Sequence, residues 1–140
     1  MNKNTPEYDL YTKLSYYTLS HKDPSFIHQY IVDAYTAQTA DESIKPIAIT
    51  FALVGLYLSV EKGLSGKEVQ RVHMLLGEKP KIFPKIILPK ERGNIRVGDV
   101  LKAREGEERD KKISQWCKSV WEAYKENRNI IKEYLNSASI

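Results

Sequence analysis

The stretch Lys45–Lys62, with the sequence KPIAITFALVGLYLSVEK, decides the fold of this chain. Its residues 46–60 carry no charge, so a helix over them is apolar on every side and must be enclosed by other helices or by lipid. A membrane span needs about 20 apolar residues, and this run is shorter. Thr50, Gly55 and Ser59 also make a poor lipid-facing surface. We therefore predict the central helix of an all-α domain that has no contact with a membrane.

The length of 140 residues and the single cysteine set the broad class of the protein. One domain, residues 1–140, is expected, with a core large enough to need no disulfide or structural metal. Cys117 has no partner for an internal disulfide, and the N-terminus lacks the apolar segment of a secretory signal. CxxC pairs, an HExxH sequence and a Gly-rich phosphate loop are absent. We predict a cytoplasmic protein without a cofactor or bound metal.

Helix signals recur on both sides of the central stretch. Most of the predicted helices begin at a capping residue or with a proline in the first turn, and apolar residues recur at helical spacing in the first, second, fourth and last. The predicted helices cover about residues 5–20, 23–38, 46–62, 65–76, 100–104 and 107–135. The polar run 126–129 is a candidate kink in the last of them. The expected architecture is a compact bundle of five or six helices around the buried central helix.

Residues 77–98, which we call the arm, break this pattern. Three prolines exclude a helix across it: Pro80, Pro84 and Pro89. Five large apolar side chains make it too hydrophobic for a solvated linker: Ile82, Phe83, Ile86, Ile87 and Leu88. We predict an extended, Pro-rich arm that crosses the helical body, with its isoleucines inserted into a groove.

Positive charge is concentrated in the arm. Residues 1–77 hold 7 Lys and Arg against 8 Asp and Glu, whereas residues 78–140 hold 15 against 10. Six arm residues are candidates to bind an anion: Lys79, Lys81, Lys85, Lys90, Arg92 and Arg96. A basic segment favours an anionic partner without identifying it. Phe83 is the only aromatic residue here, so base stacking has little support, and ordinary solvated lysines are the alternative that we favour.

Four polar residues of the second predicted helix are candidates to line a ligand pocket: His28, Asp33, Tyr35 and Gln38. A histidine and a carboxylate can form an acid–base pair or share a metal. Positions five apart lie about 140° apart around a helix, so His28 and Asp33 meet only where other helices close the site. Gln38 lies on the apolar face and needs hydrogen-bond partners there, which a network between helices can supply without a ligand. His21 and His73 are weaker candidate ligands.

Four sequences occur together in this chain: HQYIVDAYTAQ, KPIAITFALVGLYLSVEKGLSGKEVQRVHMLL, RGNIRVGDVL and WCKSVWEAYKENR. Over about residues 11–128 they resemble an uncharacterised bacterial family of small helical proteins, known only as a domain of unknown function. The resemblance implies a helical cytoplasmic protein and no particular activity. Relatives often carry a histidine where Thr39 stands, and some carry paired cysteines near the N-terminus. This chain departs from both patterns, which weakens the case for a metal site in it.

Three functions follow from these observations, in order of preference. The first is a non-enzymatic binding or interaction module, with a protein partner or a second copy against the apolar arm and the tyrosine-rich first two helices. The second is a ligand-binding protein or metal-dependent enzyme, with a pocket between helices formed by His28, Asp33 and Tyr35. The third is nucleic-acid binding through the basic arm. Cys117 is expected to pack as a small apolar residue and not to react.

Overall fold

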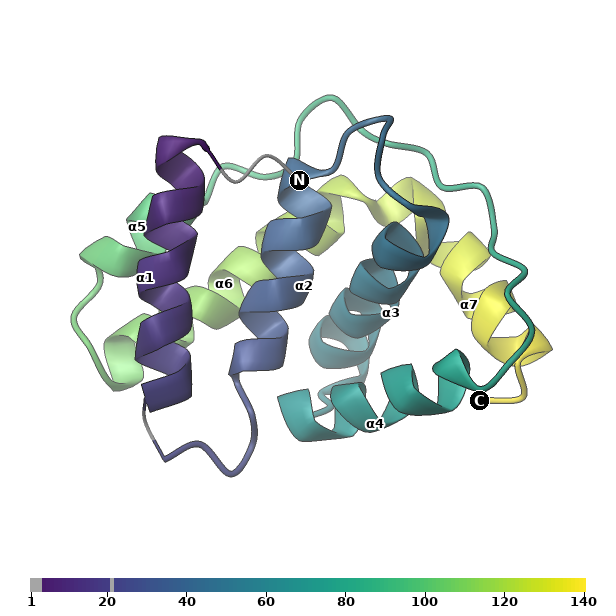
Figure 1. Ribbon diagram of the computed structural model, residues 1–140, viewed down its shortest axis with the longest axis horizontal. Coiled ribbons are helices and arrows are strands. Elements are labelled where there is room, and N and C mark those ends of the chain that lie inside the picture. The colour runs from purple at the N-terminus through teal and green to yellow at the C-terminus, as the bar shows by residue number, and fades with distance from the viewer. Residues whose placement is uncertain (1–3, 21) are drawn as a thin grey trace.

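The computed structural model describes residues 4–20 and 22–140, and these form helices, turns and extended segments without a β-strand (Figure 1). The all-α prediction is confirmed. Seven α-helices are present in these ranges where five or six were expected, together with one short 3-10 helix. They are α1 (Pro6–Ser20), α2 (His28–Thr39), α3 (Pro46–Lys62), α4 (Gly66–Gly77), α5 (Val97–Lys102), α6 (Glu107–Ala123), η1 (Lys125–Asn127) and α7 (Arg128–Ser137).

Helix α3 is the buried centre of the molecule, as predicted. Pro46 occupies its first turn, and Gly63, with a φ of 68°, ends it by donating its backbone N–H to the carbonyl of Leu58. Residues 52–58 are buried without interruption because α2, α4, α6 and α7 all contact the helix (Figure 1). Among the described helices, none is long and apolar enough to cross a membrane.

Helix α2 begins at His28, five residues later than predicted from Asp23. The side chain of Asp23 instead accepts hydrogen bonds from the backbone N–H of Ile27 and from Ser25 Oγ, the latter at 3.0 Å. These bonds hold residues 23–27 in turns, with Phe26 at a φ of 57°. The carbonyl of Phe26 lies so close to Gly66 that a β-carbon there would collide with it. The Asp-Pro signal therefore starts a turn that packs on α4, and the helix follows the turn.

The helix predicted over residues 107–135 is divided at η1 into α6 and α7, beside the predicted kink. Asn127 at the break is fully buried, and its side chain contacts the backbone of the arm. Tyr124, just before η1, donates its hydroxyl to the carbonyl of Ala37 in α2 at 2.6 Å. The break lets α7 turn aside and pack against α3.

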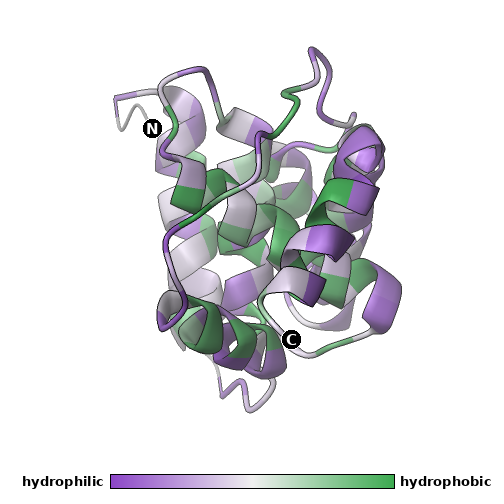
Figure 2. Cartoon of the chain, turned by 90° about the vertical axis from the view of Figure 1, so that its right-hand side faces the viewer, coloured by the Kyte–Doolittle hydropathy of each residue, from purple (hydrophilic) through white to green (hydrophobic). Residues whose placement is uncertain are grey.

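The arm runs extended from the end of α4 to the start of α5, across the side of the molecule that faces the viewer in Figure 2. Phe83, Ile86 and Leu88 are half-buried against the core, as expected for an arm that packs on the helices. The prediction that all its isoleucines are inserted is wrong, because Ile82 is 79% exposed and Ile87 51%. Consecutive side chains of an extended segment point in opposite directions, so a single segment cannot bury all of them against one surface.

Candidate functional site

His28, the first of the four predicted pocket residues, lies at the start of α2 against α1. Its Nδ1 is 2.9 Å from Thr18 Oγ1, and its ring is tilted against Phe26 at a centroid distance of 5.8 Å. Burial lowers the pKa of His28, and the charge of Asp23 opposes that shift. The ring therefore has a partner on α1 and is biased towards its neutral form.

Asp33 lies further along α2, in the core against α3. It is only 3% exposed, and its Oδ1 accepts a hydrogen bond from Gln29 Nε2 at 3.1 Å. Its Oδ2 has no hydrogen-bond partner. Burial raises the pKa of Asp33 well above its ordinary range, and the bond from Gln29 offsets this only in part. The fold therefore favours the neutral, protonated form of this side chain.

Tyr35 and Gln38, the other two predicted pocket residues, contact neighbours different from those of His28 and Asp33. Tyr35 is buried and stacks on Tyr11 of α1, with ring centroids 4.1 Å apart. The amide of Gln38 accepts from Trp116 Nε1 at 3.0 Å and donates to the carbonyls of Arg92 and Ile95 at 3.1 and 2.7 Å. Gln38 thus joins α2, α6 and the arm without a ligand. The four pocket candidates point to separate partners and do not converge.

The described histidines and acids do not form a metal centre, since no group of three His, Cys, Asp or Glu side chains in residues 4–20 and 22–140 is close enough to hold an ion. His73 of α4 uses its Nε2 to bond the carbonyl of Phe51 at 2.7 Å, and its ring stacks on the Phe51 ring. His21 lies outside the described residues.

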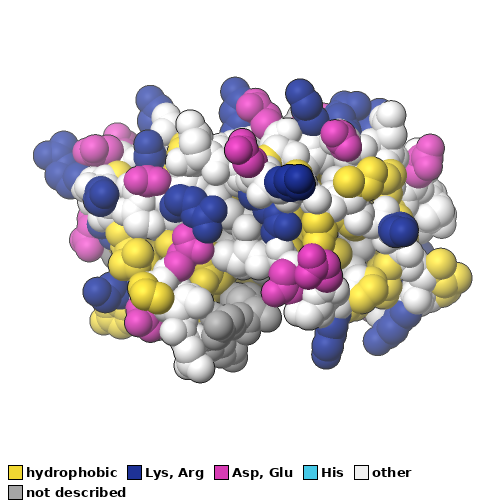
Figure 3. Space-filling view, turned by 90° about the horizontal axis from the view of Figure 1, so that it is seen from above, with side chains coloured by type: hydrophobic (Ala, Val, Ile, Leu, Met, Phe, Trp, Pro, Cys, Tyr) yellow, Lys and Arg dark blue, Asp and Glu magenta, His cyan; other side chains and the backbone are white. Residues whose placement is uncertain are grey.

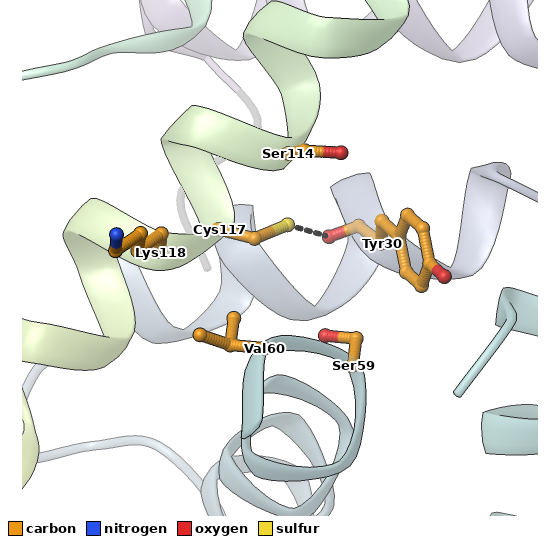
Figure 4. A pocket seen from close by; sticks show the side chains of 6 residues that line it. All are labelled: Tyr30, Ser59, Val60, Ser114, Cys117 and Lys118. Atoms are coloured by element: carbon orange, nitrogen blue, oxygen red, sulfur yellow. Dashed lines mark hydrogen bonds between the residues drawn. The ribbon is translucent and has the colours of Figure 1, made fainter. Parts of the chain in front are cut away.

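A pocket of about 240 Å³ opens between α2, α3 and α6 (Figure 4). It is lined by Tyr30, Ser59, Val60, Ser114, Cys117 and Lys118. The Cys117 thiol points at the carbonyl of Tyr30, with Sγ 3.5 Å from the oxygen, whereas Lys118 points away from the sulfur (Figure 4). Burial raises the pKa of Cys117 well above its ordinary value. A protonated thiol without a base is a poor nucleophile, so this pocket lacks the chemistry of a cysteine enzyme.

The six cationic candidates of the arm divide into two groups. Four lysines are exposed and make no ion pair with any described residue: Lys79, Lys81, Lys85 and Lys90. The two arginines are held by the fold. Arg92 donates to the carbonyl oxygens of Pro89, Ala37 and Ala40, which places its charge at the C-terminal end of α2. Arg96 binds the Glu7 carboxylate through two nitrogens, at 2.8 and 2.9 Å.

Three of these cations meet at one hollow. Lys90, Arg92 and Arg96 line a cavity of about 430 Å³ together with Gln38, Glu91, Gly93 and Asn94. Gly93, at a φ of 91°, makes the turn that brings Lys90 and Arg96 to the same hollow, and glycine adopts such a φ without strain. The other three candidates, Lys79, Lys81 and Lys85, lie earlier along the arm.

A fixed contact that the sequence analysis did not identify holds the middle of the arm. Asn127 Oδ1 accepts the backbone N–H of Ile87 at 2.7 Å, and Asn127 Nδ2 donates to the carbonyl of Ile87 at 2.9 Å. One side chain thereby satisfies both backbone groups of an extended residue, as a neighbouring strand would. The only signal in the sequence is a polar residue where the apolar spacing of the last helix is interrupted.

The sequence matches a family described only as being of unknown function, DUF5946, over residues 8–125. The chain belongs to this family. The match runs from α1 to the end of α6 and includes the whole arm, so the hollow and the arm lie within the DUF5946 region. No curated protein and no solved structure shows significant similarity to the chain.

The exposed apolar side chains of this DUF5946 chain lie mostly at the end of α4 and in the arm. Of the seven large ones in residues 4–20 and 22–140, four belong to residues 74–87: Met74 and Leu75 in α4, and Ile82 and Ile87 in the arm. The tyrosines that we expected at a partner surface contribute less to the exposed apolar area. Tyr17 and Tyr35 are buried, although Tyr16 is exposed. Seen from above, basic, acidic and apolar side chains are interspersed and form no uniform basic patch (Figure 3).

Proposed function

We propose that this chain is a non-enzymatic interaction module that acts in the cytoplasm and binds a partner protein across the arm and the end of α4. The observation that carries the proposal is the exposure of Met74 (67%), Leu75 (48%), Ile82 (79%) and Ile87 (51%) within fourteen residues of sequence. Single exposed apolar residues are ordinary, but four of them so close together in the chain favour an interaction surface at the end of α4 and the arm. We call this group the arm surface.

The arm surface is held in place before any partner arrives. Asn127 fixes Ile87, Gln38 fixes the carbonyls of Arg92 and Ile95, and Phe83 packs edge-on against Phe51. An ordered segment loses less conformational entropy on binding than a flexible one. This supports a surface that a partner can bind with little rearrangement.

The charges beside the arm surface favour a partner with acidic residues. Lys79, Lys81 and Lys85 alternate with the apolar residues of the arm and have no acidic partner among the described residues. Two copies joined through this surface would bring like charges together, which opposes association. A different protein, one that presents acidic and apolar side chains together, fits the surface better than a second copy does.

Cross-linking in cells tests this proposal. A photo-reactive amino acid at position 82 should link the chain to a discrete protein, whereas the same group at Lys111, exposed in the first half of α6, should not. The linked protein is identified, purified and titrated against the purified chain. Ile82→Asp and Met74→Asp should each weaken binding at least about tenfold. Leu19→Asp, at another exposed apolar residue on α1, should leave binding unchanged.

Two results would overturn the proposal. One is a linked product that contains only a second copy of this chain. The other is a purified partner whose affinity is the same for the Ile82→Asp variant and the unmodified chain.

A further inference from the structure

We propose that the hollow formed by residues 90–96 is a binding site for a phosphoryl group, held by Lys90, Arg92 and Arg96. This site is separate from the arm surface and does not depend on a protein partner. Three cations and one acid, Glu91, line the hollow, and Glu7 of α1 pairs with Arg96, so three positive charges stand against two negative ones and one remains in excess. An anion bound there would be attracted mainly by Lys90 and Arg92, the two cations without an ion pair among the described residues.

Arg92 is the central group because it forms no ion pair with a carboxylate of the described residues, although Asp41 lies near enough to feel its charge. Its Nε donates to the carbonyl of Pro89 at 2.9 Å, and its Nη1 donates to the carbonyls that end α2. Carbonyl oxygens orient the guanidinium but leave its net charge in place. Its remaining nitrogen, Nη2, makes no hydrogen bond with any described residue. Because Arg92 lines the hollow, we infer that this nitrogen is the donor it offers to a ligand there.

Arg96 and Lys90 complete the set in different ways. Arg96 uses Nε and Nη2 for the Glu7 carboxylate, which fixes the guanidinium and leaves Nη1 without a partner in the described chain. Lys90 is exposed and makes no ion pair there, so its ammonium group is free to turn towards a bound anion. The site thus combines two fixed arginines with one exposed, unpaired lysine.

Two helices hold the backbone of the hollow in place, α2 through Gln38 and α6 through Ser119. Gln38 Nε2 donates to the carbonyls of Arg92 and Ile95, on either side of Gly93. Gly93 packs against Ser119 so closely that a β-carbon on residue 93 would collide with Ser119 Oγ. Because the loop and both guanidinium groups are already fixed, a ligand loses little free energy in ordering them. The lysines earlier in the arm lack such an arrangement.

The chemistry of these donors selects a phosphoryl group. Guanidinium groups present planar sets of N–H donors that match the oxygens of phosphate, and a dianion gains more from several cations than a carboxylate does. The hollow is open to solvent, so the phosphoryl group can belong to a small phosphate ester, which carries about two negative charges, or to the backbone of a nucleic acid, in which each phosphodiester carries one. Both sources offer phosphoryl oxygens to the same donors.

Titration with inorganic phosphate, followed by amide chemical shifts and at constant ionic strength against chloride, tests the site. Phosphate should shift the amides of residues 90–96 with saturation in the millimolar range, and Lys90→Gln should weaken this binding at least about threefold. Lys90 makes no internal hydrogen bond or ion pair with the described residues, so its replacement should leave the fold intact. Lys85→Gln, which removes an arm lysine outside the hollow, should leave phosphate binding unchanged.

A single-stranded oligonucleotide distinguishes the two sources. If a nucleic acid is the natural ligand, the oligonucleotide should bind at least about a hundredfold more tightly than phosphate, still shift residues 90–96, and weaken in both Lys90→Gln and Lys85→Gln. If a small ester is the ligand, only Lys90→Gln should affect either probe. Saturation that leaves residues 90–96 unshifted, or equal phosphate affinity for Lys90→Gln and the unmodified chain, would exclude the site.

Discussion

The carboxyl group of Asp33 in α2 occupies the space in which a side chain would stand at position 55 in α3. A β-carbon on Gly55 would lie much closer to Asp33 Oδ2 than van der Waals contact allows. That oxygen has no hydrogen-bond partner, and a buried polar atom without one lowers stability. Helices α2 and α3 therefore pack together here on a glycine and an acid that depend on each other.

Gly55→Ala should destabilise the protein by about 1–3 kcal/mol, because the added methyl group forces Asp33 or the helices to move. The loss should exceed the gain of about 1 kcal/mol that alanine brings over glycine within a helix. Urea denaturation measures both effects. Gly77→Ala is the matched control, since a β-carbon there has no atom within 4 Å, and it should be neutral or stabilising.

The double variant Asp33→Ala/Gly55→Ala identifies the cause of that loss. With the carboxyl group removed, the alanine at position 55 has room, so the cost of Gly55→Ala should largely disappear. An equal cost of Gly55→Ala in both backgrounds would mean that Asp33 is not the obstacle.

Asp33→Asn should stabilise the protein at neutral pH, with a benefit that depends on pH. In the unfolded chain Asp33 ionises near pH 3.9, whereas burial raises its pKa well above that in the folded protein. Between these two pKa values the folded state holds the extra proton, so stability falls as pH rises. Every tenfold difference in acidity between the two states lowers the free energy of unfolding by about 1.4 kcal/mol once the pH exceeds both pKa values. Asparagine does not ionise and avoids this loss.

The measurement is the unfolding free energy of both proteins by urea from pH 4 to pH 8. The difference between Asp33→Asn and the unmodified chain should be small at pH 4 and grow towards pH 8. A difference that stays constant over this range would show that Asp33 does not carry a raised pKa.

Cys117 should be almost unreactive in the native protein. Its side chain is 3% exposed and burial raises its pKa, so a thiol reagent at pH 8 should modify it at least about a hundredfold more slowly than in guanidinium chloride. Ser114→Cys in a Cys117→Ser background supplies an exposed thiol on the same pocket and should react quickly. Equal rates for Cys117 in native and unfolded protein would contradict the burial of the thiol.

The sequence predicted α3 well because its uncharged run, its proline at the start and its glycine at the end are all local features. It also predicted an arm without helix, since Pro80, Pro84 and Pro89 act on their own neighbours. The individual contacts of the site were not predictable in this way. Asn127 meets Ile87 across forty residues, and Gln38 meets Ile95 across fifty-seven. Such pairs form only when the helices pack against each other, and neighbouring residues in the sequence do not indicate which distant residues will meet.

The same limit applies to the candidate residues of α2. His28 and Asp33 share one helix, yet their surroundings come from other helices. Thr18 of α1 bonds His28, whereas Asp33 fills the space beside Gly55 of α3, where its Oδ2 has no hydrogen-bond partner. The anion candidates were chosen by charge alone. Their division into Lys90, Arg92 and Arg96 at one hollow and three lysines outside it depends on the turn at Gly93 and on the hydrogen bonds of Gln38.

Asn127→Ala should release the arm while leaving the helices folded. The change removes both hydrogen bonds to the backbone of Ile87, so the free energy of unfolding should fall by about 1–3 kcal/mol. The Ile87 amide should exchange its hydrogen faster, and trypsin should cleave after Lys85 more readily, because both need the arm to leave the surface.

Asn129→Ala, in the same turn of the chain, is the control for this change. Its side chain is exposed and forms no hydrogen bond with the described residues, so exchange and cleavage should match the unmodified chain. If the arm surface binds a partner as proposed, Asn127→Ala should also weaken that binding, since the partner must then order a mobile segment. Unchanged exchange at Ile87 in Asn127→Ala would show that the arm is held by its apolar contacts alone and that Asn127 does not fix it.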